Sequence, residues 1–563
     1  MLMIIKKIYF IFIILLLYQS PLYSKSNSLN NFNSKDLSKY FSGLVASINK
    51  KNSEALNFFN SSKILINSHD PFIQKYVNSL VLEDKVVQAI NVIKQNKNND
   101  NINFFDAHLL LIIDNLKKNN LDKAYYNLVN VIENTTISKF NLAILESLRQ
   151  YIFVFKEGRI SDDNKTLGKL SIISETFQRC YLNDSRTDSY FRNLINDNES
   201  DFTRYIFFYL SYLVETGKNE DAKKITNDIE FINSTLLLSQ GKSWIENNQY
   251  YRFKEVFSCK NYNDVIAEFL FLISNLYSSD DNFEKSNFYL NLSSFLNPKF
   301  KFNLSLIIEN HYFNKDYNKA KKILKNLKKE DKFYYWFRLK KEAQIISKER
   351  NDKESLNFIV SNFKRINQPN KKFLFDLANF YKKSKEYKNA IDYYTKIIDE
   401  LDDESDVKSD ILYRRGASYE RIKDYEKADR DFLEALEINP GDAYTLNYLA
   451  YSWLERDYKI DKAMDMLKIA YEAESDDPYI IDSIGWAYFL TRDYLKAEKF
   501  LKQAVELMPE DPIVNDHYGD ILWMLDRKIQ ARYFWNNVLQ MKEAEKDLIE
   551  KINIKMIEGL KNS

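Results

Sequence analysis

The residues that could do chemistry in this chain are few and lie far apart. The four histidines are His69, His108, His311 and His517, and none has another histidine or a cysteine at a metal-ligand spacing. A zinc site needs such a cluster, because about four ligands must converge on one ion. The histidines therefore predict no metal site, and packing is the simpler interpretation.

The two cysteines are Cys180 and Cys259. An oxidising compartment would allow a disulfide between them, provided that their Cα atoms lie roughly 4.4–6.8 Å apart. The sequence gives no such distance. A disulfide and two buried free thiols both stay open.

Motifs of catalysis are absent from the sequence. It has no phosphate-binding loop, dinucleotide fingerprint, nucleophile elbow or zinc motif. The acidic stretch from Asp402 to Asp406 falls in an expected turn and is better interpreted as solvated charge. We expect no enzyme and no cofactor. An enzyme with a site in residues 143–265 is kept as an alternative.

Composition restricts the class of protein further. The 563 residues include 81 basic and 80 acidic side chains, for a net charge of +1, which gives no support for nucleic-acid binding. Only 10 glycines and 8 prolines are present. So few turn-forming residues favour a helical protein over a β-rich one.

The strongest pattern lies between Lys371 and Met541. Each unit has a small residue, a bulky residue three positions later, an alanine, and a second bulky residue. The alanines are 38, 35, 34 and 34 positions apart. The members of the four sets are Ala378, Gly416, Ala450, Gly485 and Gly519; Tyr381, Tyr419, Trp453, Tyr488 and Leu522; Ala390, Ala428, Ala463, Ala497 and Ala531; and Tyr394, Phe432, Leu467, Leu501 and Trp535.

This pattern resembles the tetratricopeptide repeat (TPR) family, whose period is about 34 residues. The resemblance implies an all-α fold, an α-solenoid that is a right-handed superhelix of helix pairs with a concave binding face. Two units match with most positions filled: Leu412, Gly416, Tyr419, Ala428, Phe432, Ala435 and Pro440; and Pro478, Gly485, Tyr488, Ala497, Leu501, Ala504 and Pro509.

The physics agrees with the resemblance. Paired helices pack roughly 8–10 Å apart, and a small residue at the crossing lets the backbones approach. One pair cannot bury its apolar face alone, so neighbouring pairs must stack.

The chain is predicted to be exported. Residues 1–24 resemble a signal peptide, with Lys6 and Lys7 before the apolar stretch Ile8–Tyr18 and cleavage after Ser24. The location is then periplasmic. An uncleaved segment that anchors the chain in the inner membrane is the alternative, so membrane association stays open.

The remaining boundaries follow the strength of the repeat pattern. Residues 25–40 are expected to be a linker, 41–142 degenerate TPR-like pairs, 143–265 a divergent helical region, and 266–370 divergent repeats. Clear repeats occupy 371–541. Residues 542–563 form an amphipathic capping helix, with a partner-binding helix as the alternative.

By the resemblance, the first helix of each pair lines the concave groove. Aromatic side chains there would anchor a protein or peptide, and carboxylates would favour a neutral or basic ligand. Ordinary packing of Trp486 and Trp523 is the alternative. The predicted groove residues are Tyr444, Asn447, Tyr451, Tyr479, Asp482, Trp486, Phe489, Asp516, Asp520 and Trp523.

The stretches 482–488 and 515–523 resemble exported bacterial TPR proteins more specifically. One branch of these is an outer-membrane lipoprotein that brings cell-wall hydrolases to a carboxyl-terminal processing protease. This chain has no N-terminal cysteine for a lipid anchor. We expect a scaffold that binds a protein or peptide, such as a protease or envelope enzyme. A structural spacer is the alternative, favoured if the chain's own helices fill the groove.

Overall fold

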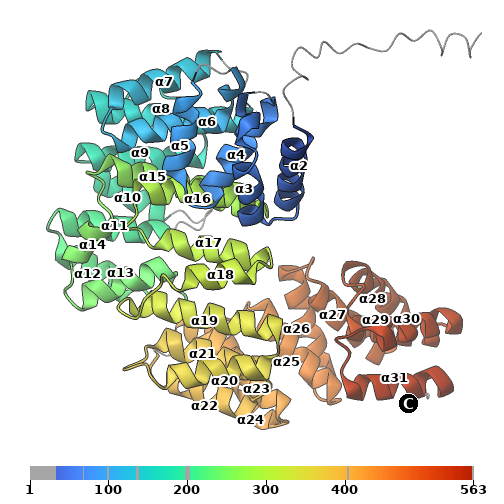
Figure 1. Ribbon diagram of the computed structural model, residues 1–563. Helices are drawn as coiled ribbons and strands as arrows, with labels where there is room; N and C mark the ends of the chain where they lie inside the picture. Colours follow the sequence, from blue (N-terminus) through green and yellow to red (C-terminus); the bar gives the residue numbers. More distant parts are fainter. Residues whose placement is uncertain are drawn as a thin grey trace, which may run out of the picture. The chain divides into compact units, whose positions relative to one another are not determined.

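The computed structural model describes residues 33–67, 69–97, 100–134, 138–196, 203–401 and 405–560. The regular elements within these ranges are α-helices and short 3-10 helices, with no β-strand there (Figure 1). The all-α prediction is therefore confirmed. The predicted signal segment 1–24 lies outside the described residues, and the first helix already begins at Ser34, inside the expected linker.

The chain forms two compact units. The first comprises Met1–Asp228 and Thr235–Tyr335, and the second comprises Ile229–Ser234 and Trp336–Ser563. The helices of the first unit are α2 (Ser34–Ile48), α3 (Asn52–Asn60), α4 (Asp70–Leu82), α5 (Val86–Gln95), α6 (Phe105–Lys117), α7 (Leu121–Asn134), α8 (Lys139–Glu157), α9 (Lys169–Leu182), α10 (Thr187–Ile195), α11 (Arg204–Glu215), α12 (Asn219–Asn227), α13 (Leu236–Glu246), α14 (Tyr251–Val256), α15 (Tyr262–Ser279), α16 (Phe283–Leu296), α17 (Phe302–Phe313) and α18 (Tyr317–Leu324), with the 3-10 helices η2 (Lys63–Asn67) and η3 (Asp100–Ile102).

The second unit contains most of α19 and all the later helices, which follow one another in pairs (Figure 1). They are α19 (Lys332–Glu349), α20 (Asp352–Phe363), α21 (Lys371–Lys383), α22 (Tyr387–Ile398), α23 (Asp406–Arg421), α24 (Tyr425–Ile438), α25 (Ala443–Glu455), α26 (Ile460–Ala473), α27 (Pro478–Leu490), α28 (Tyr494–Leu507), α29 (Pro512–Met524), α30 (Lys528–Gln540) and α31 (Lys546–Glu558).

Small residues lie where the paired helices cross, as the repeat pattern predicts. A Cβ atom added at Gly519 would lie 2.4 Å from Trp535 Nε1, and one added at Gly485 would lie 2.8 Å from Leu501 Cγ. The five alanines of the pattern are all 0% exposed. Close backbone approach therefore holds each pair together, and the α-solenoid prediction is confirmed.

Aspartates set where the first helices of the later pairs begin. Asp442, Asp477 and Asp511 are N-cap residues whose carboxylates accept hydrogen bonds from backbone N–H groups of the first turn. Such caps satisfy donors that a helix start leaves unpaired. Pro478 and Pro512 follow two of these caps, where a missing N–H costs nothing.

The helix α31 closes the last pair. Ile552 is 0% exposed, and Leu548, Met556 and Leu560 pack against the same core as Trp535. The opposite face is exposed and mostly charged, although it also carries the exposed apolar side chains of Ile554 and Ile557. This is the predicted capping helix.

The first unit uses the same crossing at its start. A Cβ atom added at Gly43 would lie 2.6 Å from Phe59 Cε1, and Ala55 and Ala89 are fully buried. Later helices then pack back on the early ones, because α16 contacts α4. Asn291 Nδ2 donates to Val81 O at 2.8 Å across this contact, and both ends of the bond are buried.

The divergent region is held by a disulfide and a caged arginine. Cys180 and Cys259 are joined, with their Cα atoms 5.7 Å apart, which settles the open alternative in favour of the bond. Arg204 forms two hydrogen bonds with the buried Glu268, at 2.8 and 2.7 Å. Its guanidinium carbon lies 3.8 Å from the centroid of Phe271 and 4.6 Å from that of Phe302.

Candidate functional site

The predicted groove residues all lie on three first helices, α25, α27 and α29, which we call the inner wall. Neighbouring helices of this wall contact each other directly, α25 with α27 and α27 with α29. Side chains at equivalent positions of successive repeats therefore lie side by side. The structure divides the predicted residues into a covered part, a buried part and an exposed part.

The covered part belongs to α29. Lys555 Nζ, on the capping helix, lies 2.6 Å from Asp516 Oδ1 and 2.7 Å from Asp520 Oδ2. Trp535 Nε1 also donates to Asp520 Oδ1, at 3.0 Å. A Cβ atom added at Gly559 would lie 1.9 Å from Trp523. The capping helix and the following Gly559 thus cover the side of α29 that was predicted to face a ligand.

The buried part surrounds His517, which the sequence did not mark as a wall residue. His517 Nδ1 lies 2.8 Å from Asp482 Oδ2, and both side chains are buried. Burial opposes a charged imidazole, but Asp482, Asp516 and Asp520 outweigh it and raise the pKa of His517. Asp482 Oδ1 is buried without a hydrogen-bond partner among the described residues.

Trp486 belongs to a stack of three nearly parallel rings. Its ring centroid lies 4.1 Å from that of His517 and 4.7 Å from that of Phe489. Its indole Nε1 donates to Glu455 at 3.0 Å. The chain's own side chains therefore hold Trp486 in place, which favours packing as its main role. Tyr451 lies at the edge of this stack, with its ring centroid 6.3 Å from that of His517.

The exposed part consists of the predicted residues Tyr444 and Tyr479. With Ile513, which lies at the start of α29, they form a row that we call the tyrosine row. Their exposed fractions are 51%, 59% and 41%. Asp477 and Glu474, with Asp442, raise the pKa of the Tyr444 hydroxyl, which reports a negative potential around this ring. The row combines apolar contact area with carboxylates and is open to a partner.

Asn447 lies between the buried stack and the tyrosine row. It is half-buried, and its Oδ1 atom has no hydrogen-bond partner among the described residues.

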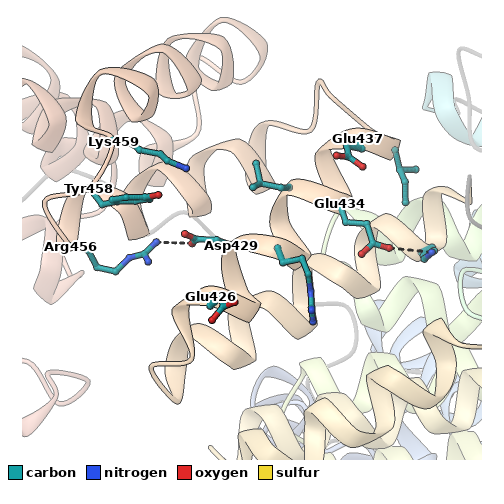
Figure 2. A pocket seen from close by; sticks show the side chains of 11 residues that line it. Glu426, Asp429, Glu434, Glu437, Arg456, Tyr458 and Lys459 are labelled. Atoms are coloured by element: carbon teal, nitrogen blue, oxygen red, sulfur yellow. Dashed lines mark hydrogen bonds and ion pairs between the residues drawn. The ribbon is translucent and has the colours of Figure 1, made fainter.

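A hollow of about 1300 Å³, separate from the inner wall, lies beside α24. Figure 2 shows Asp429 and Glu434 among its lining residues, with Asp429 paired to Arg456. The Asp429–Arg456 distance is 2.7 Å, and Glu434 lies 3.2 Å from Lys408 Nζ. One wall is the turn before α26, where Lys459 has φ +47°. This turn is one residue longer than in the other clear repeats, because Ala450 and Ala463 are 13 positions apart instead of 12. Acidic and basic side chains that line the hollow pair with one another, so the hollow indicates no charged ligand.

The described part of the chain contains neither a metal-ligand cluster nor a membrane-spanning helix. No group of three or more His, Cys, Asp or Glu side chains within it could hold a metal ion. The described helices also include none that is both long and apolar enough to cross a membrane.

In the divergent region, where the alternative of an enzyme would place its site, Ser258 contacts two carboxylates. Ser258 Oγ donates to Glu215 at 2.7 Å, and Ser258 N donates to Asp264 at 3.1 Å. Burial raises the pKa of Asp264 to about 6. Asp264 lies in the first turn of α15, where a carboxylate stabilises the helix start. A structural role explains these contacts.

Comparison with known proteins supports the repeat assignment. Tetratricopeptide repeat family models match residues 372–400, 409–442 and 480–511. A relative from Pseudomonas aeruginosa, TPR repeat-containing protein PA4667, is 29% identical over 110 residues, which is 20% of this chain and 18% of that protein. The match therefore spans less than a fifth of the relative.

Solved structures of similar fold have low identity. A tetratricopeptide repeat protein from Parabacteroides merdae is 16% identical, with 52% of this chain and 98% of that chain covered and a TM-score of 0.34. The thermophilic TPR protein TTC0263 from Thermus thermophilus is 17% identical, with 33% and 97% covered and a TM-score of 0.29. The repeat matches and the buried small-residue crossings together show that this chain carries tetratricopeptide repeats, the fold of a protein-interaction scaffold.

Proposed function

We propose that this protein is an exported scaffold that holds a lysine- or arginine-containing segment of a protein partner against the tyrosine row. The observation that carries this proposal is the exposure of Tyr444 and Tyr479. Their backbone N–H groups donate to the N-cap carboxylates of Asp442 and Asp477, which therefore lie beside the two rings. Tyrosine rings offer rigid contact area and a π face for cations. Carboxylates around them favour basic partners and repel acidic ones.

The cover on α29 restricts where a ligand can bind on the inner wall. Asp516, Asp520 and Trp523 already contact the capping helix, so a ligand reaches α25 and α27 more easily than α29. Lys555 also provides an internal example of the expected chemistry, because a lysine from another helix meets wall carboxylates there.

The test uses two synthetic peptides of equal length, one lysine-rich and one glutamate-rich, with interspersed leucines. We expect the full chain to bind the lysine-rich peptide more tightly, and the affinity to fall with added salt. The Tyr444→Ala/Tyr479→Ala variant should weaken binding at least about tenfold. Tyr533→Ala is the matched control, because Tyr533 is 62% exposed on α30, away from the row. Equal binding of both peptides, or equal loss in the control, would contradict the proposal.

Export is part of the proposal. It is supported by the signal-like residues 1–24 and by the Cys180–Cys259 disulfide, since disulfides persist in oxidising compartments such as the periplasm. Cell fractionation and the mass of the mature chain test it. Recovery of a chain with reduced cysteines from the cytosol would contradict it.

The resemblance of residues 482–488 and 515–523 to exported TPR adaptors suggests an envelope protease or cell-wall enzyme as the partner. Affinity capture from an envelope extract, with and without the Tyr444→Ala/Tyr479→Ala changes, tests this role. Only proteins lost in the variant count as partners of the row.

A structural spacer is the second candidate, favoured by the cover that α31 places on α29. Deleting residues 542–563 separates the two candidates. A scaffold should keep its peptide affinity or gain some, provided that circular dichroism shows the helices intact. A spacer should bind neither peptide before or after the deletion.

A further inference from the structure

The first helix of the chain carries an exposed seam of regular spacing. Its members on α2 are Ser34, Ser38, Phe41, Val45 and Ile48, separated by alternating steps of four and three residues. This spacing places the five side chains on one face of the helix. The opposite face of α2, with Tyr40, Gly43 and Ala46, is buried in the first unit.

The seam is open and apolar at its centre. Phe41, Val45 and Ile48 are 53%, 57% and 78% exposed. A groove of about 720 Å³ lies beside Phe41 and Val45, lined also by Phe58 of α3. Single exposed apolar residues are ordinary, but a contiguous stripe of them marks an interaction surface.

The pattern of side-chain size indicates what covers the seam. If a second copy of α2 packs antiparallel with its symmetry point near Gly43, then Phe41 faces Val45 of the other copy, and Ile48 faces Ser38. Each bulky side chain meets a smaller one, the arrangement that fills a helix interface without voids. In a parallel pair, Phe41 would face Phe41 and Ser38 would face Ser38, and the fit would be lost.

The flanks of the seam permit the same arrangement. In the antiparallel pair, Ser42 meets Ser42 at the symmetry point, where a small residue allows close approach, and Lys35 meets Asn49 without like-charge repulsion. No acid faces an acid and no lysine faces a lysine across these flanks. Helix-on-helix packing is also the way in which neighbouring repeats of a solenoid contact each other.

We propose that two copies of this chain associate through antiparallel packing of their α2 helices. The helix is 15 residues long, so the contact is smaller than a standard interface of roughly 1,600 Å². The dimer is therefore weak and forms at micromolar concentration. It is independent of the tyrosine row, and it would give the scaffold two binding sites whose combined affinity exceeds either alone.

Cross-linking tests the geometry directly, because both native cysteines are bonded and an introduced one is the only thiol. Ser42→Cys should form a disulfide-linked dimer in the mature full chain under oxidation. Asn49→Cys is the matched control on the same helix, since two copies of that position lie about 18 Å apart along an antiparallel pair. Equal cross-linking of the two variants would overturn the antiparallel arrangement.

Sedimentation velocity over a concentration series tests association itself. Wild type should shift from one to two copies as concentration rises. Val45→Glu should raise the dissociation constant at least about tenfold, because it would bury an unpaired charge. Ile529→Glu should leave it unchanged, since Ile529 is 87% exposed elsewhere. A wild-type chain that stays monomeric throughout would overturn the proposal.

Discussion

The clear repeats of the second unit and the divergent helices of the first unit are stabilised by different means. In the repeats, the same close contact between a small residue and a bulky side chain recurs, with Gly519 against Trp535 and Gly485 against Leu501. The divergent helices also use individual contacts, such as the ion pair of Arg204 with Glu268 and the disulfide between Cys180 and Cys259. A recurring fit leaves a period in the sequence, whereas an individual contact does not.

The two means of stabilisation can be compared at the alanine position of the repeat. Ala390, Ala428 and the later alanines are buried with nothing polar to satisfy. At the equivalent position of the divergent repeats, Ser286 is equally buried, and its hydroxyl accepts a hydrogen bond from Asn310 Nδ2 at 2.8 Å. The serine fits the same space but requires a partner. The helix pairs are therefore kept in the divergent repeats, although the sequence pattern is weaker there.

The largest expected effect is at Arg204. The variant Arg204→Met leaves the carboxylate of Glu268, which is 3% exposed, without its partner. Removing one side of a buried ion pair costs roughly 3–5 kcal/mol. Urea denaturation of the full chain should show a large loss in the transition of the first unit.

The double variant Arg204→Met/Glu268→Gln is the control for that effect. It removes the stranded charge while keeping the volume, so it should recover part of the lost stability. If the double variant is no more stable than Arg204→Met, the aromatic cage around the guanidinium, and not the ion pair, is the main contribution.

The disulfide should have the next largest effect. Replacing both cysteines by serine opens a loop of 79 residues in sequence separation, and loss of a native disulfide costs about 2–5 kcal/mol. Denaturation midpoints of the double variant and wild type measure the effect. Wild type unfolded in the presence of a thiol reductant should match the variant. If reduction has no effect on the midpoint, the divergent region does not depend on this bond.

The sequence predicted the clear repeats because their physics is periodic. The small residue, the alanine and the two bulky residues recur at a helical crossing, so spacing alone indicates the packing. The cage around Arg204 and the return of α16 onto α4 could not be predicted in this way. Their partners are up to about two hundred residues apart in sequence, as with Asn291 and Val81, and no local pattern marks them.

An intermediate effect is expected from Gly519→Ala. The new Cβ would lie 2.4 Å from Trp535 Nε1, and moving the indole would also disturb its hydrogen bond to Asp520. Overpacking of this kind costs roughly 1–3 kcal/mol. Gly441→Ala is the control, because nothing lies within 4 Å of its added Cβ. Equal melting temperatures for the two variants would show that the crossing can adjust.

The candidate site was predicted less completely than the fold. The resemblance placed Tyr444 and Tyr479 on the wall, and the structure shows them exposed there. It also placed Asp516, Asp520 and Trp523 on the wall, but cover by α31 depends on Lys555 and Gly559, which lie outside the repeat period. His517 was missed as a wall residue, because its ring stacks on Trp486 only through contact between repeats.

The smallest effect concerns pH and tests whether the repeats also use an individual polar contact. Because the pKa of His517 is raised in the folded state, its charge stabilises the fold below the ordinary value of about 6.5, and that stability is lost as pH rises through the raised pKa. Burial, with Asp516 nearby, raises the pKa of Asp520 to about 7, and its ionisation adds a loss in the same direction.

The melting temperature of wild type should therefore fall between about pH 6.5 and alkaline pH. His517→Gln should flatten this fall, and the loss that remains should end near pH 7, because the contribution of Asp520 is lost between its ordinary pKa of about 3.9 and its raised value of about 7. Asp482→Asn, which removes the carboxylate 2.8 Å from the imidazole, should flatten it as well, because the imidazole then loses the charge that favours its protonation. Parallel curves for wild type and both variants would show that the pair of His517 and Asp482 is no part of the pH response.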